Sequence, residues 1–490
     1  MMTVKNKTQL ITYPDSLGGN LGTLGHILET HFSGLFGGGI HILPPFPSSG
    51  DRGFAPVTYL DIAPEFGTWE DIRRIGKKSP ILLDLMVNHL SAESIYFQDF
   101  LKNGHRSEYA DLFIPTSKIW PDGDPPSDEI EKMFLRRKEP FSDFTIRGTG
   151  EVVRVWTTFG KTTPSRQIDI DVNSETARRL LTEFMTKFGE NDVSMVRLDA
   201  VGFVTKQRGT TCFFVEPEIY GFLGWISELA NARGIEVLPE VHADYTTQFK
   251  LAERGYWIYD FILPYTVLEA LLNRTGKRLK EYLRIRPHRQ FTMLDCHDGV
   301  PIIPDLNGLY SSEDARKVVS ICLNRGANLS PVFSPRHKGP DGFDVHQIRG
   351  TFYSLLDCSD DAYLAARAIQ FFTPGVPQVY YVGLLAGEND QTGAERTGDG
   401  REINRHNYST DEVGRNLQRP VVQRLLRLIR FRNEYAAFDG SFQVLDSDDS
   451  ILHLSWERGK SKCQLMVNFD SEKAVIRYAD ADGSLVDFPL

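Results

Sequence analysis

The chain has 490 residues, of which 41% are hydrophobic and 24% charged, and its formal net charge is -10. These proportions are typical of a globular protein with a large core, and the acidic charge argues against nucleic acid, whose backbone requires a broad basic surface. No run approaches the roughly 18 apolar residues of a membrane span, and the N-terminus lacks the apolar centre of a signal peptide, so we expect a cytoplasmic protein with no membrane partner.

Five cysteines are scattered along the chain without any C-x-x-C pair. An odd, dispersed set of thiols is typical neither of a disulfide framework nor of a structural zinc site, so we expect reduced core residues. The sequence also contains no H-E-x-x-H, Walker or EF-hand pattern. We therefore expect no metal or nucleotide cofactor.

Short apolar runs alternate with helix-like segments along the chain. Eight runs have the character of strands: 10–13, 39–45, 81–89, 194–202, 235–242, 259–264, 291–298 and 377–383. Amphipathic segments with helical spacing lie between them, for example at 68–78, 174–189 and 421–438. This alternation predicts an α/β fold with a parallel sheet covered by helices, and eight strands close a TIM (β/α)8 barrel.

Two intervals are too long for ordinary barrel connections, and they predict inserted subdomains on the catalytic face. The predicted division is barrel 1–90, insertion 91–173, barrel 174–298, second insertion 299–357, barrel 358–438 and C-terminal domain 439–490. The C-terminal domain contains four alternating runs: SFQVL, SILHLSWE, KCQLMVNF and AVIRYA. They predict a small antiparallel β-domain.

Polar and ionisable residues stand at the ends of several predicted strands. They are Asp84, Asn88, His89, Arg197, Asp199, Glu240, His242, His297 and Asp298. In a TIM barrel such positions converge on one active site. Helix capping explains any single Asp of this kind, but several acids in one apolar cleft are costly unless their charges are used.

Asp199, Glu240 and Asp298 lack metal-ligand spacing and suit glycosyl transfer, in which an acid protonates the leaving oxygen and a carboxylate attacks the anomeric carbon. Arg197 lies two residues before Asp199 on the same strand face, where it would keep this nucleophile ionised. Glu240 follows Pro239 in an apolar run, so we expect a raised pKa, as a general acid requires.

The segments DLMVNH, VRLDAVGF, LPEVH and LDCHD resemble, in order and spacing, the four signature regions of the α-amylase superfamily of retaining glycoside enzymes. The resemblance implies that Asp199 is the nucleophile, Glu240 the acid/base and Asp298 the transition-state stabiliser. It also implies a glucose subsite lined by His89, Arg197 and His297.

Further segments, QLITYPDSLG, HILPPFPSSGDRGF, QIDIDVN, PGVPQVYYVGLLAG and GREINRHNY, resemble the sucrose phosphorylase group, which transfers glucose between fructose and inorganic phosphate. The resemblance implies that Asp51 and Arg401 cap the far side of a single glucose ring. It places Phe159 beside the glucose and Gln167 near the acceptor subsite. A pocket for one glucosyl unit argues against amylase activity on starch.

The stretch MFLRRKEPF sets Arg136, Arg137 and Lys138 side by side in the first insertion of an acidic chain. Arg137 matches an arginine that contacts phosphate in sucrose phosphorylases, whereas Arg136 stands where those enzymes have a proline. In the second insertion, His346 stands where they have a tyrosine, just before Gln347. Lys138 has no assigned role and is expected to be solvated.

These departures resemble the branch that acts on sucrose 6F-phosphate, in which an extra Arg and a His hold the phosphate of the fructosyl part. The residues expected to bind phosphate or the fructose 6-phosphate part are Arg136, Arg137, Gln167, Lys338, His346 and Gln347. We expect His346 to titrate near neutrality and to strengthen binding when charged. The alternative is that His346 and Arg136 only pack the loops.

The resemblance thus implies a retaining hexosyltransferase that converts sucrose 6F-phosphate and phosphate into α-D-glucose 1-phosphate and D-fructose 6-phosphate through a covalent glucosyl-enzyme. Its partners would be small molecules. A phosphorylase of plain sucrose, glucosylglycerol or glucosylglycerate is the alternative. A catalytically inactive binding barrel predicts loss of at least one of the three carboxylates, and all three are present.

Overall fold

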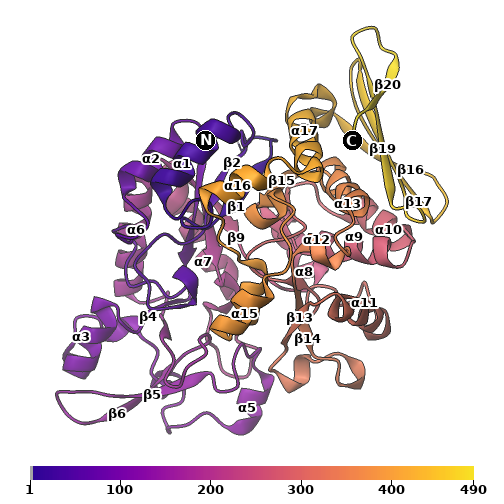
Figure 1. The fold of residues 1–490 in the computed structure, drawn as a ribbon. Coiled ribbons are helices and arrows are strands. Elements are labelled where there is room, and N and C mark those ends of the chain that lie inside the picture. Colours follow the sequence, from indigo (N-terminus) through magenta and orange to yellow (C-terminus); the bar gives the residue numbers. More distant parts are fainter. Residues whose placement is uncertain (1–3) are drawn as a thin grey trace.

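The computed structural model describes residues 4–490 and has a barrel of eight parallel strands at its centre (Figure 1). The barrel strands are β1 (Gln9–Thr12), β2 (Gly39–Ile42), β3 (Ile81–Met86), β8 (Val193–Asp199), β9 (Glu236–Pro239), β10 (Ile258–Asp260), β11 (Gln290–Thr292) and β15 (Val376–Tyr380). Their order in the sheet is β10-β11-β15-β1-β2-β3-β8-β9. Each strand overlaps one of the predicted runs, so the predicted TIM barrel is confirmed.

An outer ring of helices covers the barrel. Its members are α1 (Leu21–His31), α2 (Trp69–Gly76), α6 (Glu175–Glu190), α7 (Glu218–Asn231), α8 (Tyr245–Glu253), α9 (Leu263–Leu272), α10 (Lys277–Ile285), α13 (Asp360–Phe372) and α17 (Pro420–Glu434). Helix α6 begins where the Ser174 hydroxyl accepts a hydrogen bond from the Ala177 N–H at 3.0 Å. Its buried residues Leu180, Phe184 and Phe188 recur at helical spacing and face the sheet.

Below the carboxyl ends of its strands, the interior of the barrel is mainly apolar, apart from a buried hydrogen bond of 3.1 Å between Gln378 and Gln9. A buried cluster fills the lower layers: Leu82, Met195, Leu238, Tyr259, Phe261, Phe291, Met293 and Val376. Because alternate residues of a strand share a face, Met195, Arg197 and Asp199 all point inward from β8. Charged side chains are thereby confined to the end of the barrel where the two insertions lie.

Both insertions lie at the same end of the barrel, at the bottom of the view in Figure 1. The first contains β4 (His89–Ser91), β5 (Phe141–Thr145), β6 (Val152–Trp156), β7 (Gln167–Asp169), α3 (Ile95–Asn103), α4 (Thr116–Ile119) and α5 (Ser127–Lys132). The second contains β12 (Val300–Pro301), β13 (Asn328–Pro331), β14 (Val345–Arg349), α11 (Ser312–Asn324) and α12 (Phe352–Leu355). The insertions touch, since the Ser334 hydroxyl donates to the Met133 carbonyl oxygen at 2.9 Å. The domain boundaries stay predictions.

The segment after β15 passes beside the site before the chain enters its C-terminal sheet. It forms α14 (Tyr381–Leu384), α15 (Gln391–Thr397), the 3₁₀ helix η7 (Gly400–Asn404) and α16 (Thr410–Asn416). The antiparallel sheet contains β16 (Ser441–Leu445), β17 (Ile451–Arg458), β18 (Ser461–Asn468), β19 (Lys473–Ala479) and β20 (Leu485–Phe488). The Trp456 indole N–H donates to the Phe372 carbonyl oxygen at 2.7 Å and fastens this sheet to α13.

The C-terminal β-domain is confirmed, but its fifth strand, β20, was not among the predicted runs. This strand has only four residues, its Leu485 is exposed, and Pro489 follows directly, so the segment is too short to mark a strand by an alternating pattern. From residue 4 onward, no helix has the length and apolar character needed to cross a membrane.

Candidate active site

Three barrel strands deliver the predicted carboxylates to one cavity. Asp199 is the last residue of β8, Glu240 directly follows β9, and Asp298 lies in the loop after β11. Eleven of the predicted site residues line this cavity: Asp51, His89, Arg136, Phe159, Gln167, Asp199, Glu240, His297, Asp298, Gln347 and Arg401. Residues that are distant in sequence therefore share one site at the carboxyl end of the barrel.

Arg197 connects the acids beneath the cavity. Its Nη1 lies 2.8 Å from Asp199 Oδ1 and 2.5 Å from Asp84 Oδ1, and its Nη2 lies 3.2 Å from Glu240 Oε1. Burial alone would lower the pKa of this guanidinium, but Glu240, Asp84 and Asp199 raise it well above its ordinary value. One permanent cation thus serves three buried carboxylates.

The pKa values of the two central carboxyls move in opposite directions. Burial raises the pKa of Asp199 well above its ordinary value, since Arg197 offsets the desolvation only in part and Glu240 adds repulsion. Burial also disfavours the charged form of Glu240, but Arg197 and His242 lower its pKa to about 2. The predicted raised pKa of Glu240 and the expectation that Arg197 keeps Asp199 ionised are therefore both wrong for the unliganded site, where the raised pKa belongs to Asp199.

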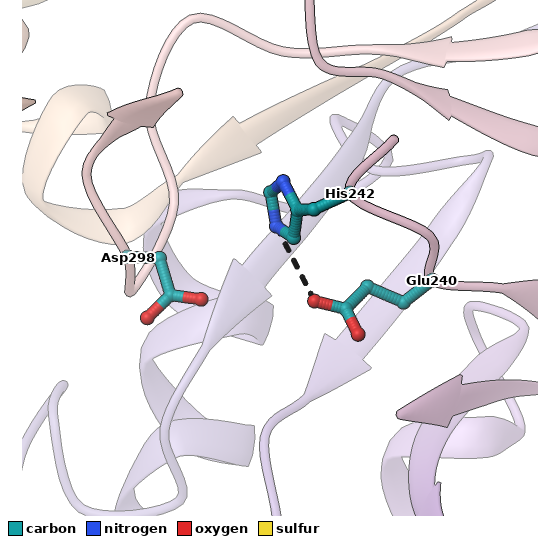
Figure 2. Close-up of side chains that lie close together, drawn as sticks. All are labelled: Glu240, His242 and Asp298. Atoms are coloured by element: carbon teal, nitrogen blue, oxygen red, sulfur yellow. Dashed lines mark ion pairs between the residues drawn. The ribbon is translucent and has the colours of Figure 1, made fainter. Parts of the chain in front are cut away.

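His242 is the main contact of Glu240 that the sequence left without a role. Its Nε2 lies 3.4 Å from Glu240 Oε1, and its Nδ1 lies 3.2 Å from Asp305 Oδ1. Figure 2 shows the imidazole beside Glu240, with Asp298 across from it. Burial would lower the pKa of His242, but Asp305 and Glu240 raise it to about 10. A second cation therefore faces the predicted acid/base.

The same three side chains of Figure 2 offer ligand atoms within 4.8 Å of one another, as a metal site would. Both ring nitrogens of His242, however, face carboxylates, and its raised pKa keeps them protonated at neutral pH. Because a metal ligand must be a neutral imidazole, this cluster fits a hydrogen-bonded carboxylate site better than a metal centre.

The side of the cavity predicted to hold glucose is closed by an ion pair between Arg401 and Asp51. Gln167 Nε2 lies 3.3 Å from Asp51 Oδ2, so this glutamine lies beside the capping carboxylate. Arg401 Nη1 is also 3.8 Å from Asp298 Oδ1. Burial opposes ionisation of Asp298, but His297, Arg401 and Arg405 lower its pKa below its ordinary value.

Two histidines on this side are neutral hydrogen-bonding groups. Burial lowers the pKa of His297 to about 3, and it also lowers the pKa of His89. His89 Nε2 lies 2.9 Å from the Phe54 carbonyl oxygen, which requires the hydrogen on Nε2. The Nδ1 atoms of both rings have no partner among the described residues.

Four phenylalanines of the cavity wall were missed by the sequence reasoning: Phe54, Phe134, Phe203 and Phe213. Phe54 stacks on the His297 ring with centroids 4.9 Å apart and planes at 7°. Phe203 contacts Phe213, with centroids 4.7 Å apart. All four lie outside the barrel strands, where an apolar residue in a loop gives no signal that distinguishes packing from contact with a sugar.

Arg136 and His346 meet across the two insertions. Arg136 Nη1 lies 2.6 Å from His346 Nε2, and His346 Nδ1 lies 2.5 Å from the Ile303 carbonyl oxygen. Because a guanidinium only donates, Nε2 must accept and Nδ1 must carry the hydrogen. Burial, followed by the charge of Arg136, lowers the pKa of His346 well below its ordinary value. The expectation that His346 titrates near neutrality is wrong, and the imidazole orients Arg136 as a neutral acceptor.

Three further cations of the two insertions do not line the cavity. Arg137 is buried, and its Nη2 donates to the Thr162 carbonyl oxygen at 2.9 Å. Lys338 is exposed and lies 3.1 Å from Asp344. Lys138 is exposed, as expected. Arg136 is therefore the member of the RRK stretch that points into the site.

A (β/α)8 barrel whose strand ends bring three carboxylates, an arginine and neutral histidines into one cavity suits an enzyme of glycosyl transfer. Residues 13–255 match the family model of the α-amylase catalytic domain. The fold and the site thus point to the same class.

Similar proteins identify the group within this family to which the chain belongs. The chain is 59% identical over 487 residues to the sucrose 6(F)-phosphate phosphorylase of Thermoanaerobacterium thermosaccharolyticum, covering 99% of this chain and 100% of the relative. It is 42% identical over 491 residues to the glucosylglycerol phosphorylase of Marinobacter adhaerens, covering 98% of both. The crystal structure of sucrose 6F-phosphate phosphorylase from Thermoanaerobacter thermosaccharolyticum superposes with a TM-score of 0.98 at 58% identity, covering 100% of this chain and 99% of that one. The chain belongs to the α-amylase superfamily, in its group of glycoside phosphorylases.

Proposed function

We propose that the protein is a retaining phosphorylase that converts sucrose 6F-phosphate and inorganic phosphate into α-D-glucose 1-phosphate and D-fructose 6-phosphate. The observation that carries the proposal is Arg136, a guanidinium that lines the cavity and is oriented from behind by His346. A phosphate on the fructosyl part requires such a cation some distance from the bond that breaks. The 59% identical relative of that name supports the same substrate.

In the first half-reaction, Asp199 attacks the anomeric carbon of the glucosyl unit. The bond from that carbon to the fructosyl oxygen breaks, and the oxygen takes a proton from Glu240. In the unliganded site the pKa of Asp199 is raised and that of Glu240 is about 2. Donor binding must therefore weaken the contacts of Glu240 with Arg197 and His242 and shift the proton from Asp199 to Glu240 before the attack. Asp298 remains ionised and stabilises the positive charge that develops on the sugar ring.

In the second half-reaction, a phosphate oxygen attacks the glucosyl-enzyme. The ester bond to Asp199 breaks, the phosphate proton passes to Glu240, and two inversions give net retention. Arg137 is the residue proposed to bind this phosphate, but its guanidinium is held by the Thr162 carbonyl. We infer that residues 136–138 rearrange between the two half-reactions, as active-site loops commonly do.

The partners under this proposal are sugars and phosphate. Five free cysteines suit a reducing compartment, and together with a phosphorylated substrate they support a cytoplasmic location.

The direct test compares phosphorolysis of sucrose 6F-phosphate and of sucrose by the purified enzyme. We expect kcat/KM to be at least about 30-fold higher for the phosphorylated donor, which corresponds to about 2 kcal/mol from one charge contact. A higher kcat/KM for plain sucrose would refute the proposal. In the reverse direction, glucose 1-phosphate is offered with fructose 6-phosphate, fructose, glycerol or glycerate, and a preference for glycerol or glycerate would assign the enzyme to the alternative.

A further inference from the structure

The turn that carries Asp51 has an unusual backbone. Asp51 and Arg52 both have φ 52°, in the left-handed region that side chains other than glycine seldom adopt. Gly53 follows at φ 103°, where a Cβ would lie 2.6 Å from the Pro44 carbonyl oxygen. Two consecutive strained residues persist only where the surrounding structure holds them. The carboxylate that closes the glucose side thus stands on a turn that other segments must keep in place.

The side chain of Arg52 anchors this turn to two distant segments. Its Nη1 lies 2.9 Å from the Arg405 carbonyl oxygen, in the segment after β15. Its Nη2 lies 3.0 Å from Ser16 Oγ and 3.3 Å from Asp15 Oδ1, both of which follow β1. The guanidinium also lies over the Tyr13 ring, with its central carbon 4.0 Å from the ring centroid. Neither the sequence nor the proposed mechanism assigns this cation a role.

The same guanidinium joins the turn of Asp51 to the helix that carries Arg401. Arg52 Nη1 lies 3.7 Å from Glu402 Oε2, and Glu402 directly follows Arg401 in η7. Asn407, further along this segment, contacts the guanidinium through its Oδ1. The two members of the ion pair that closes the glucose side therefore lie on segments that Arg52 joins, although Arg52 does not itself line the cavity.

The turn also supports two histidines of the glucose side. Phe54 directly follows Gly53, and its carbonyl oxygen lies 2.9 Å from His89 Nε2. The Phe54 ring stacks on the His297 ring with centroids 4.9 Å apart. A displaced turn would therefore alter recognition of the glucosyl unit rather than of the group attached to it.

We propose that Arg52 is a positioning residue for glucosyl recognition, which fastens the strained turn 51–53 so that Asp51 reaches the far end of the glucose ring. The proposal rests on the proposed function for the position of the glucosyl unit, but not for the identity of the leaving group. Because C4 is the ring carbon farthest from the anomeric carbon, the 4-hydroxyl is the group whose contact Arg52 supports.

The test uses α-D-glucosyl fluoride, which has no fructosyl part, and its 4-deoxy analogue. Arg52→Met keeps an unbranched side chain and removes the guanidinium. We expect kcat/KM for glucosyl fluoride to fall about 10- to 100-fold, because a small misplacement of a contact group can cost that much. On the 4-deoxy donor, Arg52→Met and the wild type should differ less than threefold, since the contact that Arg52 supports is already missing.

Two further variants separate the guanidinium from charge and from general effects of substitution. Arg52→Lys keeps the charge but not the planar fork of donors, and it should retain at least threefold more activity than Arg52→Met. Arg424→Met is the matched control, because Arg424 is a partly buried arginine of the outer helix α17 that pairs with Asp361. Its kcat/KM should stay within twofold of the wild type.

Wild-type kcat/KM of Arg52→Met on glucosyl fluoride would overturn the proposal, and so would an equal loss on both donors. If Arg52→Met fails to fold, Arg52→Gly relieves the left-handed backbone and still lacks the guanidinium. This variant should fold and stay at least tenfold impaired on glucosyl fluoride, whereas full activity would also overturn the proposal. A wild-type enzyme that uses glucosyl fluoride but not sucrose 6F-phosphate would refute the proposed function alone.

Discussion

Under the proposed function, Arg136 is the residue that distinguishes a phosphorylated donor from a plain one. The guanidinium lines the cavity and its hydrogen bond to His346 fixes its direction. Arg136→Ala should raise the barrier for sucrose 6F-phosphate by about 2–5 kcal/mol, because the dianion loses its desolvated partner. Plain sucrose should be turned over as before.

The measurement is kcat/KM for both donors, with Lys138→Ala as control, since Lys138 is the adjacent but exposed cation. An equal loss for both donors would instead assign Arg136 to folding or to inorganic phosphate.

The chemistry of the site was predictable from residue types, whereas its protonation was not. The strand-end positions of Asp199 and Glu240 follow from the apolar runs that precede them, and both line one cavity. Their pKa values depend on Arg197 and on His242, and His242 depends on Asp305 of another segment. Such shifts arise from distances between elements that are far apart in sequence, and spacing along the chain does not report them.

At the scale of elements, the two insertions are joined through Ser334. Ser334 is 0% exposed, donates to the Met133 carbonyl oxygen at 2.9 Å, and accepts the Leu135 N–H. This serine therefore fixes the loop segment that carries Arg136.

Ser334→Ala should leave a buried N–H and a buried carbonyl unpaired, at about 1–3 kcal/mol of stability. We expect the preference for the phosphorylated donor to fall several-fold, because the segment with Arg136 loosens while the barrel is unchanged. Thermal unfolding and the ratio of the two kcat/KM values provide the measurement. A lower melting temperature with an unchanged ratio would show that this contact only stabilises.

The elements with the strongest periodicity were the ones predicted correctly. Eight apolar runs gave the barrel, and helices α2, α6 and α17 lie where amphipathic segments predicted them. The insertions were recognised only by length, because short strands such as β4 and β7 are defined by pairing with each other rather than by a pattern of their own.

For the whole molecule, His242 makes stability depend on pH. The pKa of His242 is about 10 in the folded protein, above the ordinary 6.5. Below pH 6.5 both the folded and the unfolded state bind the proton. The stabilisation that protonated His242 gives to the folded protein is then complete. Between pH 6.5 and 10 only the folded state keeps the proton, so the free energy of unfolding should decline with rising pH, by on the order of 5 kcal/mol in total.

Urea unfolding at pH 6, 8 and 9.5 measures this decline. His242→Gln should show a smaller decline over the same range, and the difference between the two proteins isolates the histidine from lysines and tyrosines that titrate nearby. Parallel curves for both proteins would contradict the raised pKa.

The position of Arg136 inside an acidic molecule has a consequence for how the donor arrives. With a formal net charge of -10, the protein as a whole repels a dianion at long range, and only the last few ångströms are attractive. Dissolved salt screens the distant repulsion over about 8–10 Å but hardly reaches the partly buried guanidinium. Capture of a phosphorylated sugar should thus become faster as ionic strength rises, the reverse of a protein that steers anions with a basic surface.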